Sequence, residues 1–158
     1  MNDLPDINVW LALVDKRHVH HAAAAHYWFD TSVRSRAFCR ITANGFLRLS
    51  SNANVLPNPL SPHEAWITYR QFLLLPTIRW LPEPPTLDDS YCALTCAPGF
   101  VHRLWTDAYM AAFAISSQCR LVSFDGDFNR FALARQRTFQ QRFQNGGMGC
   151  HAGRHIGQ

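Results

Sequence analysis

Carboxylates are scarce in this sequence of 158 residues, which contains nine Asp and two Glu. Three of them stand at predicted element junctions: Asp6 precedes an apolar stretch, Asp107 lies near a helix start, and Asp125 follows a strand. In an open α/β sheet, groups at such junctions converge at the carboxyl ends of the strands. Clustered carboxylates suit a hard divalent cation such as Mg²⁺, which keeps several waters and also binds substrate phosphate. A site of this kind orients and activates a water for attack on a phosphate ester.

Each of these acids also has an ordinary structural interpretation. Asp6 is a predicted N-cap of a helix that starts at residue 7, and Asp107 is a first-turn acid favoured by the helix dipole. Asp125 begins an Asp-Gly turn, and Asp127 is placed to cap a short helix at residues 128–134. Three acids at three junctions of one kind nevertheless favour a shared site.

Other groups with metal-binding chemistry have simpler explanations. Glu64 belongs to a capping box that begins at Ser61, and the acids at residues 88–89 open another helix. The five cysteines are an odd number without a secretory signal, which argues against a disulfide framework. Cys92 and Cys96 lie four apart in a predicted helix and are expected to be small buried thiols rather than zinc ligands.

The elements that must position the acids alternate between strands and helices. Strands are predicted at residues 37–41, 77–81 and 120–124, and helices at residues 21–34, 62–75, 87–96 and 104–118. Thr42 is placed to cap a following segment at residues 44–51. Residues 7–14 are strand or helix by pattern alone. The alternation predicts an α/β fold with a mainly parallel sheet.

The excess of positive over negative charge lies entirely in the last 27 residues. The net charge is +4, yet residues 1–131 contain 11 basic and 11 acidic residues. We therefore interpret residues 1–131 as one domain and residues 132–158 as an Arg/Gln/Gly-rich tail. The tail is expected to be helical to about residue 143 and disordered after residue 145. No apolar run suits a membrane span and no signal peptide is visible, so a cytoplasmic protein is expected.

Four blocks of the sequence, in order, resemble the PIN-domain toxins of the VapC type. The first is Pro-Asp-Ile-Asn-Val-Trp-Leu-Ala-Leu at residues 5–13, and the others are residues 41–49, 105–114 and 121–128. Two further stretches fit the same subfamily, at residues 60–66 and 79–85. The resemblance covers residues 4–131, most of the chain.

This resemblance implies a three-layer PIN fold in which a central, mainly parallel sheet is flanked by helices. It places Asp6 at the carboxyl end of a short first strand. It also implies a toxin with Mg²⁺- or Mn²⁺-dependent endoribonuclease activity, a cognate VapB-like antitoxin, an RNA substrate and a homodimer.

The resemblance also assigns roles to single residues. Asp6, Asp107 and Asp125 correspond to the catalytic, metal-binding acids of the family. The supporting residues by this correspondence are Asn8, which braces Asp6, and Ser123, which offers a hydroxyl near the site. Asp127 is a further supporting candidate, because it stands close enough in the sequence to Asp125 to supply another carboxylate. Independently of the resemblance, three arginines lie near the candidate cleft segments and are candidates for contact with RNA phosphate: Arg40, Arg48 and Arg103.

Two departures from the family pattern keep an alternative open. Ala43 stands where the family carries an acid or a Gln, so a side-chain oxygen is missing. The final edge strand of the family is also doubtful beyond residue 131. A degenerate PIN domain that only binds antitoxin or RNA is therefore the alternative function. A receiver domain or an Asp-x-Asp phosphatase needs a lysine late in the chain, and the only lysine is Lys16.

Overall fold

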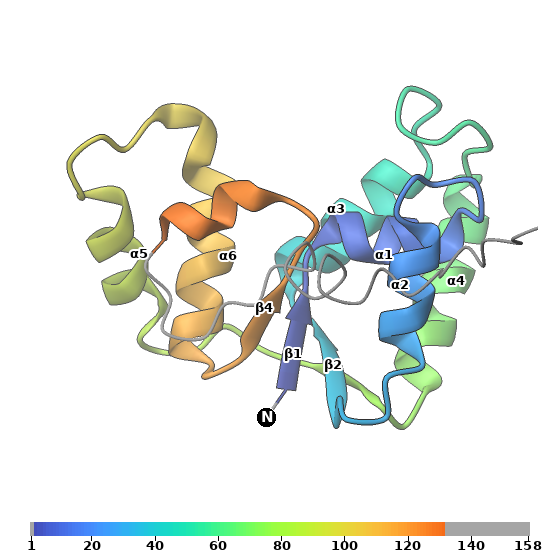
Figure 1. The fold of residues 1–158 in the computed structure, drawn as a ribbon, viewed down its shortest axis with the longest axis horizontal. Helices are drawn as coiled ribbons and strands as arrows, with labels where there is room; N and C mark the ends of the chain where they lie inside the picture. Colours follow the sequence, from blue (N-terminus) through green and yellow to red (C-terminus); the bar gives the residue numbers. More distant parts are fainter. Residues whose placement is uncertain (1, 132–158) are drawn as a thin grey trace, which may run out of the picture.

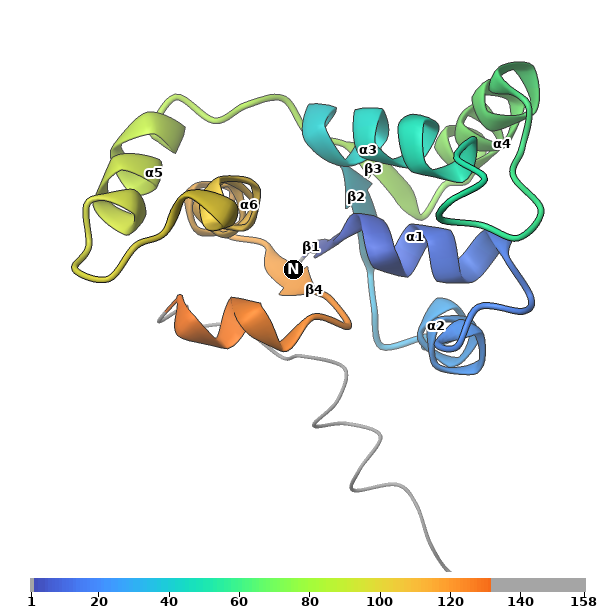
Figure 2. The same ribbon diagram turned by 90° about the horizontal axis from the view of Figure 1, so that it is seen from above.

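The structure, a computed structural model, describes residues 2–131, which form a parallel sheet covered by helices on both faces (Figures 1 and 2). The strands are β1 (Asn2–Pro5), β2 (Ser35–Phe38), β3 (Ile78–Trp80) and β4 (Arg120–Val122). The helices are α1 (Ile7–Val14), α2 (His21–Trp28), α3 (Arg40–Ser50), α4 (Pro62–Leu74), α5 (Leu87–Thr95) and α6 (Trp105–Ser116). Two 3-10 turns are η1 (His102–Leu104) and η2 (Gly126–Arg130).

The four strands pair in the order β3-β2-β1-β4, and every pairing is parallel. Parallel neighbours cannot be joined by tight turns, so helices make the crossovers. This confirms the predicted α/β class with a parallel central sheet. Because β1 lies between β2 and β4, the residue after β1 is flanked by the ends of both.

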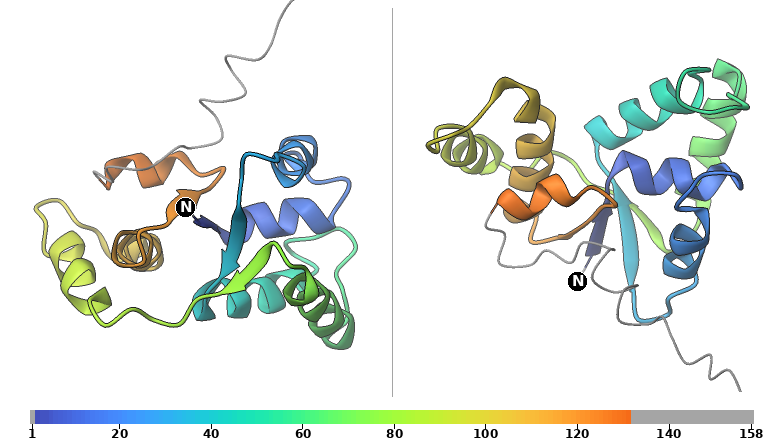
Figure 3. Two further views of the ribbon diagram at one scale, coloured as in Figure 1. Left: turned by 90° about the horizontal axis from the view of Figure 1, so that it is seen from below. Right: turned by 45° about the horizontal axis from the view of Figure 1, so that its top comes forward.

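The two faces of the sheet carry separate parts of the core, because successive strand residues point to opposite faces. Ala37 and Leu121 pack in the cluster formed with α6. Their neighbours Phe38 and Val122 pack in the clusters on the other face, which is covered by α1 to α4. Figure 3 shows this separation of α5 and α6 from α1 to α4 in two further views.

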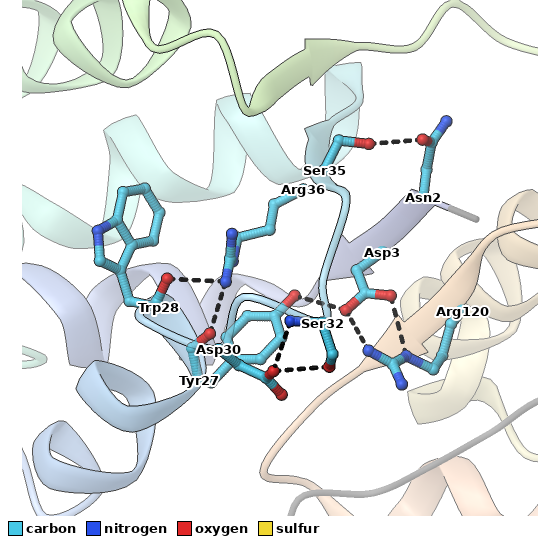
Figure 4. Close-up of polar contacts among 9 residues, drawn as sticks. All are labelled: Asn2, Asp3, Tyr27, Trp28, Asp30, Ser32, Ser35, Arg36 and Arg120. Atoms are coloured by element: carbon cyan, nitrogen blue, oxygen red, sulfur yellow. Dashed lines mark hydrogen bonds and ion pairs between the residues drawn. The ribbon is translucent and has the colours of Figure 1, made fainter.

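The predicted helix at residues 21–34 is shorter in the structure and ends at Trp28. Two features stop it. The Asp30 carboxylate accepts hydrogen bonds from the backbone and hydroxyl of Ser32, which forms a turn. The buried Arg36 guanidinium donates to the carbonyls of Tyr27 and Trp28, the last carbonyls of α2 (Figure 4).

A buried ion pair ties α2 to the amino ends of β1 and β4 (Figure 4). Asp3 is 2% exposed and accepts two hydrogen bonds from Arg120, the shorter at 2.6 Å. The Tyr27 hydroxyl donates to the same carboxylate at 3.0 Å. This network lies at the amino ends of the strands, opposite the end where Asp6 follows β1.

Three further sequence predictions need correction. The strand predicted at residues 37–41 ends at Phe38, because α3 already begins at Arg40 with Cys39 as its N-cap. Thr42 is therefore the third residue of that helix and bonds back to the cap residue. Asp125, and not Asp127, caps the turn that follows β4, and that turn is a 3-10 turn ending at Arg130.

The predicted buried state of Cys92 and Cys96 is also wrong, since both are exposed at the end of α5. The predictions for the tail and the doubtful final strand lie outside the described residues. In the described part of the chain, no helix is long and apolar enough to cross a lipid bilayer.

Candidate functional site

Asp6 is both a helix cap and the first residue after a strand, so its two predicted placements coincide. Its backbone N–H donates to the Val122 carbonyl at 2.8 Å, which extends the pairing of β1 with β4 by one residue. One carboxylate oxygen accepts from the Ile7 N–H at 2.6 Å and caps α1. The other oxygen, Oδ2, accepts from a side chain at the end of β4.

Ser123 joins the first and last parts of the site. Its hydroxyl donates to Asp6 Oδ2 at 2.8 Å and accepts from Asn8 Nδ2 and the Asp125 N–H, each at 2.9 Å. A hydroxyl has one donor and two acceptor positions, so the hydrogen-bonding capacity of Ser123 is fully used. Asn8 Oδ1 also accepts from the Phe124 N–H at 3.3 Å. The exit from β4 is thereby fastened to the first turn of α1.

Asp107 lies in the first turn of α6 and belongs to the same electrostatic environment. Its pKa is raised by burial and by the negative charges of Asp125 and Asp127. Burial raises the pKa of Asp6 to about 6, against a lowering by the Ser123 hydrogen bond, and the charges of Asp107 and Asp125 raise it further. The structure thus brings all four sequence-predicted acids to one edge of the sheet.

Arg130 is a site residue that the sequence analysis missed. Its guanidinium pairs with Asp127 Oδ1 at 2.9 Å, and its charge lowers the pKa of Asp107. Asp125 caps the turn η2 that carries both residues, because its Oδ1 accepts from the Asp127 N–H at 2.8 Å. The sequence did offer a signal for this ion pair, because an acid and a base three residues apart are neighbours on a helical turn.

The donor groups at this edge suit a hard cation. The described residues contain no group of three or more Asp, Glu, His or Cys close enough together to hold an ion by themselves. Mg²⁺ is commonly bound through one or two carboxylates, with waters and substrate phosphate as its other ligands. Asp6 and Asp107 fit this mode, with Asp125 beside them. Burial and the neighbouring negative charges disfavour the ionised form of both carboxylates, and a bound cation would offset that cost.

The three candidate arginines occupy different positions. Arg40 is the first residue of α3, and its guanidinium lies 4.7 Å from the centre of the Trp80 ring. Arg103 in η1 is close enough to lower the pKa of Asp107. Arg48 is eight residues further along α3 than Arg40, about 12 Å at the helical rise, and lies away from the strand ends. Trp80, which is 38% exposed, was not predicted from the sequence.

Ala43 faces the core and offers no oxygen to the site. It is 2% exposed and packs with Trp10 and Phe46. Two residues later, a Cβ on Gly45 would overlap the Ile7 side chain, so glycine permits close packing of α3 on α1 beside Asp6. A longer side chain at position 43 must therefore displace packed apolar groups.

Comparisons with known proteins agree with this geometry. A family model described as the PIN domain matches residues 4–133. The chain is 37% identical over 135 residues to Ribonuclease VapC41 of Mycobacterium tuberculosis, a match covering 81% of this chain and 92% of that protein. It is 33% identical over 132 residues to Ribonuclease VapC33 of the same organism, covering 82% of this chain and 92% of that protein.

Two solved structures share the fold. The crystal structure of Mycobacterium tuberculosis VapC20, described as a sarcin-ricin loop cleaving toxin, aligns with a TM-score of 0.66 at 16% identity, covering 87% of this chain and 99% of that chain. The structure of VapBC2 from Rickettsia felis on a promoter DNA fragment aligns with a TM-score of 0.63 at 14% identity, covering 87% and 98%. This chain therefore belongs to the PIN-domain family, in its VapC branch.

Proposed function

We propose that this protein is the toxin of a toxin–antitoxin pair and acts as a metal-dependent endoribonuclease. The observation that carries the proposal is the meeting of Asp6, Asp107 and Asp125 at the carboxyl edge of the sheet, where Ser123 holds Asp6 in place. The names of the curated relatives, which describe them as ribonucleases, support the same activity.

In this proposal each residue has a distinct task. A bound Mg²⁺ or Mn²⁺ supplies Lewis acidity and lowers the pKa of a bound water. Asp6 and Asp107 would hold the ion, and Ser123 with Asn8 keeps the Asp6 carboxylate in one orientation. Asp125, whose side chain is exposed, positions the attacking water in line with the bond to the leaving oxygen. Arg130 keeps Asp127 paired and limits the charge repulsion around Asp107.

An unpaired RNA segment is the proposed substrate feature. Bases in loops are free to stack on aromatic rings, whereas the bases of an A-form duplex are poorly accessible to side chains. Trp80 presents an exposed ring beside the Arg40 guanidinium, at the same edge of the sheet as the acids. Arg103 offers a second positive charge, near Asp107.

The proposed partners are a VapB-like antitoxin and a second copy of this chain. The Rickettsia felis relative was solved as VapBC2 on a DNA fragment from its promoter, which supports an antitoxin partner here. We accordingly propose action in the cytoplasm, where RNA and a newly made antitoxin are both present. Co-purification with the product of the adjacent reading frame tests the first partner, and light scattering tests the second.

The experiment for the activity is cleavage of a single-stranded RNA by the purified chain. We expect cleavage with Mg²⁺ or Mn²⁺, loss of cleavage with excess EDTA, and recovery when the divalent cation is restored. Addition of the co-purified antitoxin should inhibit cleavage. Cleavage that proceeds undiminished in EDTA would exclude the metal-dependent mechanism.

The alternative function is a degenerate PIN domain that binds antitoxin or RNA without cleaving. The buried Ala43, which supplies no oxygen, is the observation that favours it. A chain that binds antitoxin yet cleaves no RNA with Mg²⁺ or Mn²⁺ would support this alternative. Ala43→Gln should then produce cleavage, measured per folded molecule because the longer side chain has to displace packed apolar groups.

A further inference from the structure

The end of α5 carries two exposed thiols in contact with each other. Cys92 begins the last turn of the helix, and Cys96 is its C-cap. Their sulfur atoms are 3.6 Å apart and both residues are exposed. Asp107 lies in the first turn of α6, at the same end of the helix pair, but neither thiol is among the groups that shift its pKa. The proposed nuclease site therefore assigns no role to the two thiols.

We propose that Cys92 and Cys96 form a two-thiol site that chelates one thiophilic centre, of the class of Zn²⁺ and trivalent arsenic. Two sulfurs held at about 2.3 Å from one ion, with a near-tetrahedral angle between the bonds, are about 3.8 Å apart. The observed separation of 3.6 Å therefore suits two ligands of a single bent centre. Solvent or another ligand completes the coordination.

A direct disulfide fits this geometry less well than a chelated ion. A disulfide needs a sulfur separation near 2.05 Å and Cβ atoms about 3.5–4.5 Å apart. Helical residues four positions apart have Cβ atoms about 5–6 Å apart. The Cys96 N–H also donates to the Cys92 carbonyl at 2.9 Å, so this last turn is intact. Closing a disulfide would disrupt the turn, whereas an ion bridges the sulfurs without moving the backbone.

The other two cysteines of the described region provide internal controls. Cys39 and Cys119 are both buried. The Cys39 sulfur contacts the Thr42 hydroxyl at 3.6 Å, and the Cys119 thiol donates to the Ser117 carbonyl at 3.5 Å. Both lie in the core cluster beside α6, out of reach of a solvent-borne ion, so chelation by two thiols selects the exposed pair on α5.

Chelation at this pair would stabilise the end of α5 and its contact with α6. The neighbouring Tyr91 donates its hydroxyl to the Trp105 carbonyl at 3.1 Å and packs edge-on against the Trp105 ring. A bound ion links the two ends of the last turn of α5 and so restricts local opening of this contact. The expected result is slower hydrogen exchange at the end of α5 in the loaded protein.

The chemistry of the two probes is balanced without an oxidant or a reductant. Phenylarsine oxide reacts with two thiols to form two arsenic–sulfur bonds, and its oxygen leaves as one molecule of water. Zn²⁺ replaces the two thiol protons, which are released to the buffer. Arsenic stays trivalent and zinc stays divalent throughout.

The test uses the full chain with Cys150→Ser, which removes the fifth cysteine, under reduction by a phosphine. Native mass spectrometry should show one phenylarsine adduct per chain. Competition with a chromophoric chelator should show one Zn²⁺ bound per chain. Further substitution of Cys92→Ser or Cys96→Ser should abolish the adduct and weaken zinc binding at least about 10-fold, a difference of about 1.4 kcal/mol. The matched control Cys119→Ser should leave both unchanged.

Alkylation and peptide mapping give a readout that does not depend on variants. The arsenical should protect Cys92 and Cys96 from alkylation, and alkylation should resume after a small dithiol removes the arsenic. Binding of the arsenical alone, or of Zn²⁺ alone, supports the site and identifies its ligand. Failure to bind either probe, unchanged binding in both single variants, or a mass loss of two hydrogens in place of an adduct would overturn the proposal.

Discussion

Ser123 donates its hydroxyl to Asp6 Oδ2 at 2.8 Å, although the two residues are 117 positions apart in the sequence. The bond connects the residue after β4 with the residue before α1, at the carboxyl ends of the paired strands β1 and β4. It therefore fixes the orientation of the most buried carboxylate of the candidate site. A carboxylate held this way is preorganised for a metal ligand role, since the groups behind a ligand determine its orientation.

Removal of the Ser123 hydroxyl should weaken both the site and the fold. Ser123→Ala leaves Asn8 Nδ2 and the Asp125 N–H without their acceptor. We expect a loss of about 1–3 kcal/mol in the free energy of unfolding and a fall of about 10–100-fold in metal affinity or cleavage rate. Ser123→Thr keeps the hydroxyl and should restore most of the activity. Full activity in the alanine variant would show that Ser123 does not position Asp6.

The raised pKa of Asp6 predicts that its charge destabilises the metal-free fold. The pKa is about 6 in the folded protein and has an ordinary value of 3.8. Between these values the folded state binds a proton that the unfolded state has lost, so stability falls as the pH rises through this window. The full penalty, about 2–3 kcal/mol, applies above pH 6.

Asp6→Asn should therefore be more stable than the parent in EDTA at pH 7.5, because Asn also serves as an N-cap. The difference should nearly vanish close to pH 4. Denaturant unfolding at both pH values measures it, and Mg²⁺ should then stabilise the parent more than the variant. A variant that is less stable than the parent at pH 7.5 would show that the Asp6 charge is already compensated in the metal-free protein.

The positions of two arginines on α3 predict unequal contributions to RNA binding. Arg40→Gln should weaken RNA binding about equally for all RNA sequences. The slope of the logarithm of the binding constant against the logarithm of the salt concentration should become about one unit less steep, as for the loss of one phosphate contact. Arg48→Gln, on the same exposed helix surface but further from the strand ends, should have the smaller effect. Fluorescence anisotropy in a salt series measures both. Equal losses in the two variants would place the RNA along the helix and not at its first turn.

The ion pair at the opposite end of the sheet should matter for stability and not for cleavage. Asp3→Asn leaves the Arg120 charge without its carboxylate, which should cost about 3–5 kcal/mol. Replacing Asp3 and Arg120 together by Leu should cost much less, because no buried charge is then left unpaired. Denaturant unfolding checks this, and cleavage per folded molecule should be unchanged. Equal destabilisation by the single and double changes would argue against the ion pair as the cause.

The sequence predicted the fold class, and it singled out the three candidate acids, because both depend on local pattern. Asp107 and Asp125 stand next to clear helix and strand signals, and the order of the elements implied a parallel sheet. Residues 7–14 were ambiguous because a short apolar stretch has no distinguishing period. The family resemblance, not the periodicity, resolved the position of Asp6.

The missed features depend on contacts between distant segments. The end of α2 is set partly by Arg36, whose side chain reaches back from β2 to the last carbonyls of the helix. Trp80 belongs to the site edge only because β3 pairs with β2, which leads into Arg40. The exposure of Cys92 was misjudged, because helical spacing alone does not say which face of α5 meets α6.

The most direct test of the central claim is a side-by-side RNA cleavage assay of the parent, Asp6→Asn and Asp107→Asn with Mg²⁺. Asp88→Asn, a first-turn acid of α5, is the matched control for Asp107. We expect a loss of at least about 100-fold in both site variants, with unchanged cleavage by the control. Cleavage at the parental rate by both Asp6→Asn and Asp107→Asn would contradict the assignment of the acidic site.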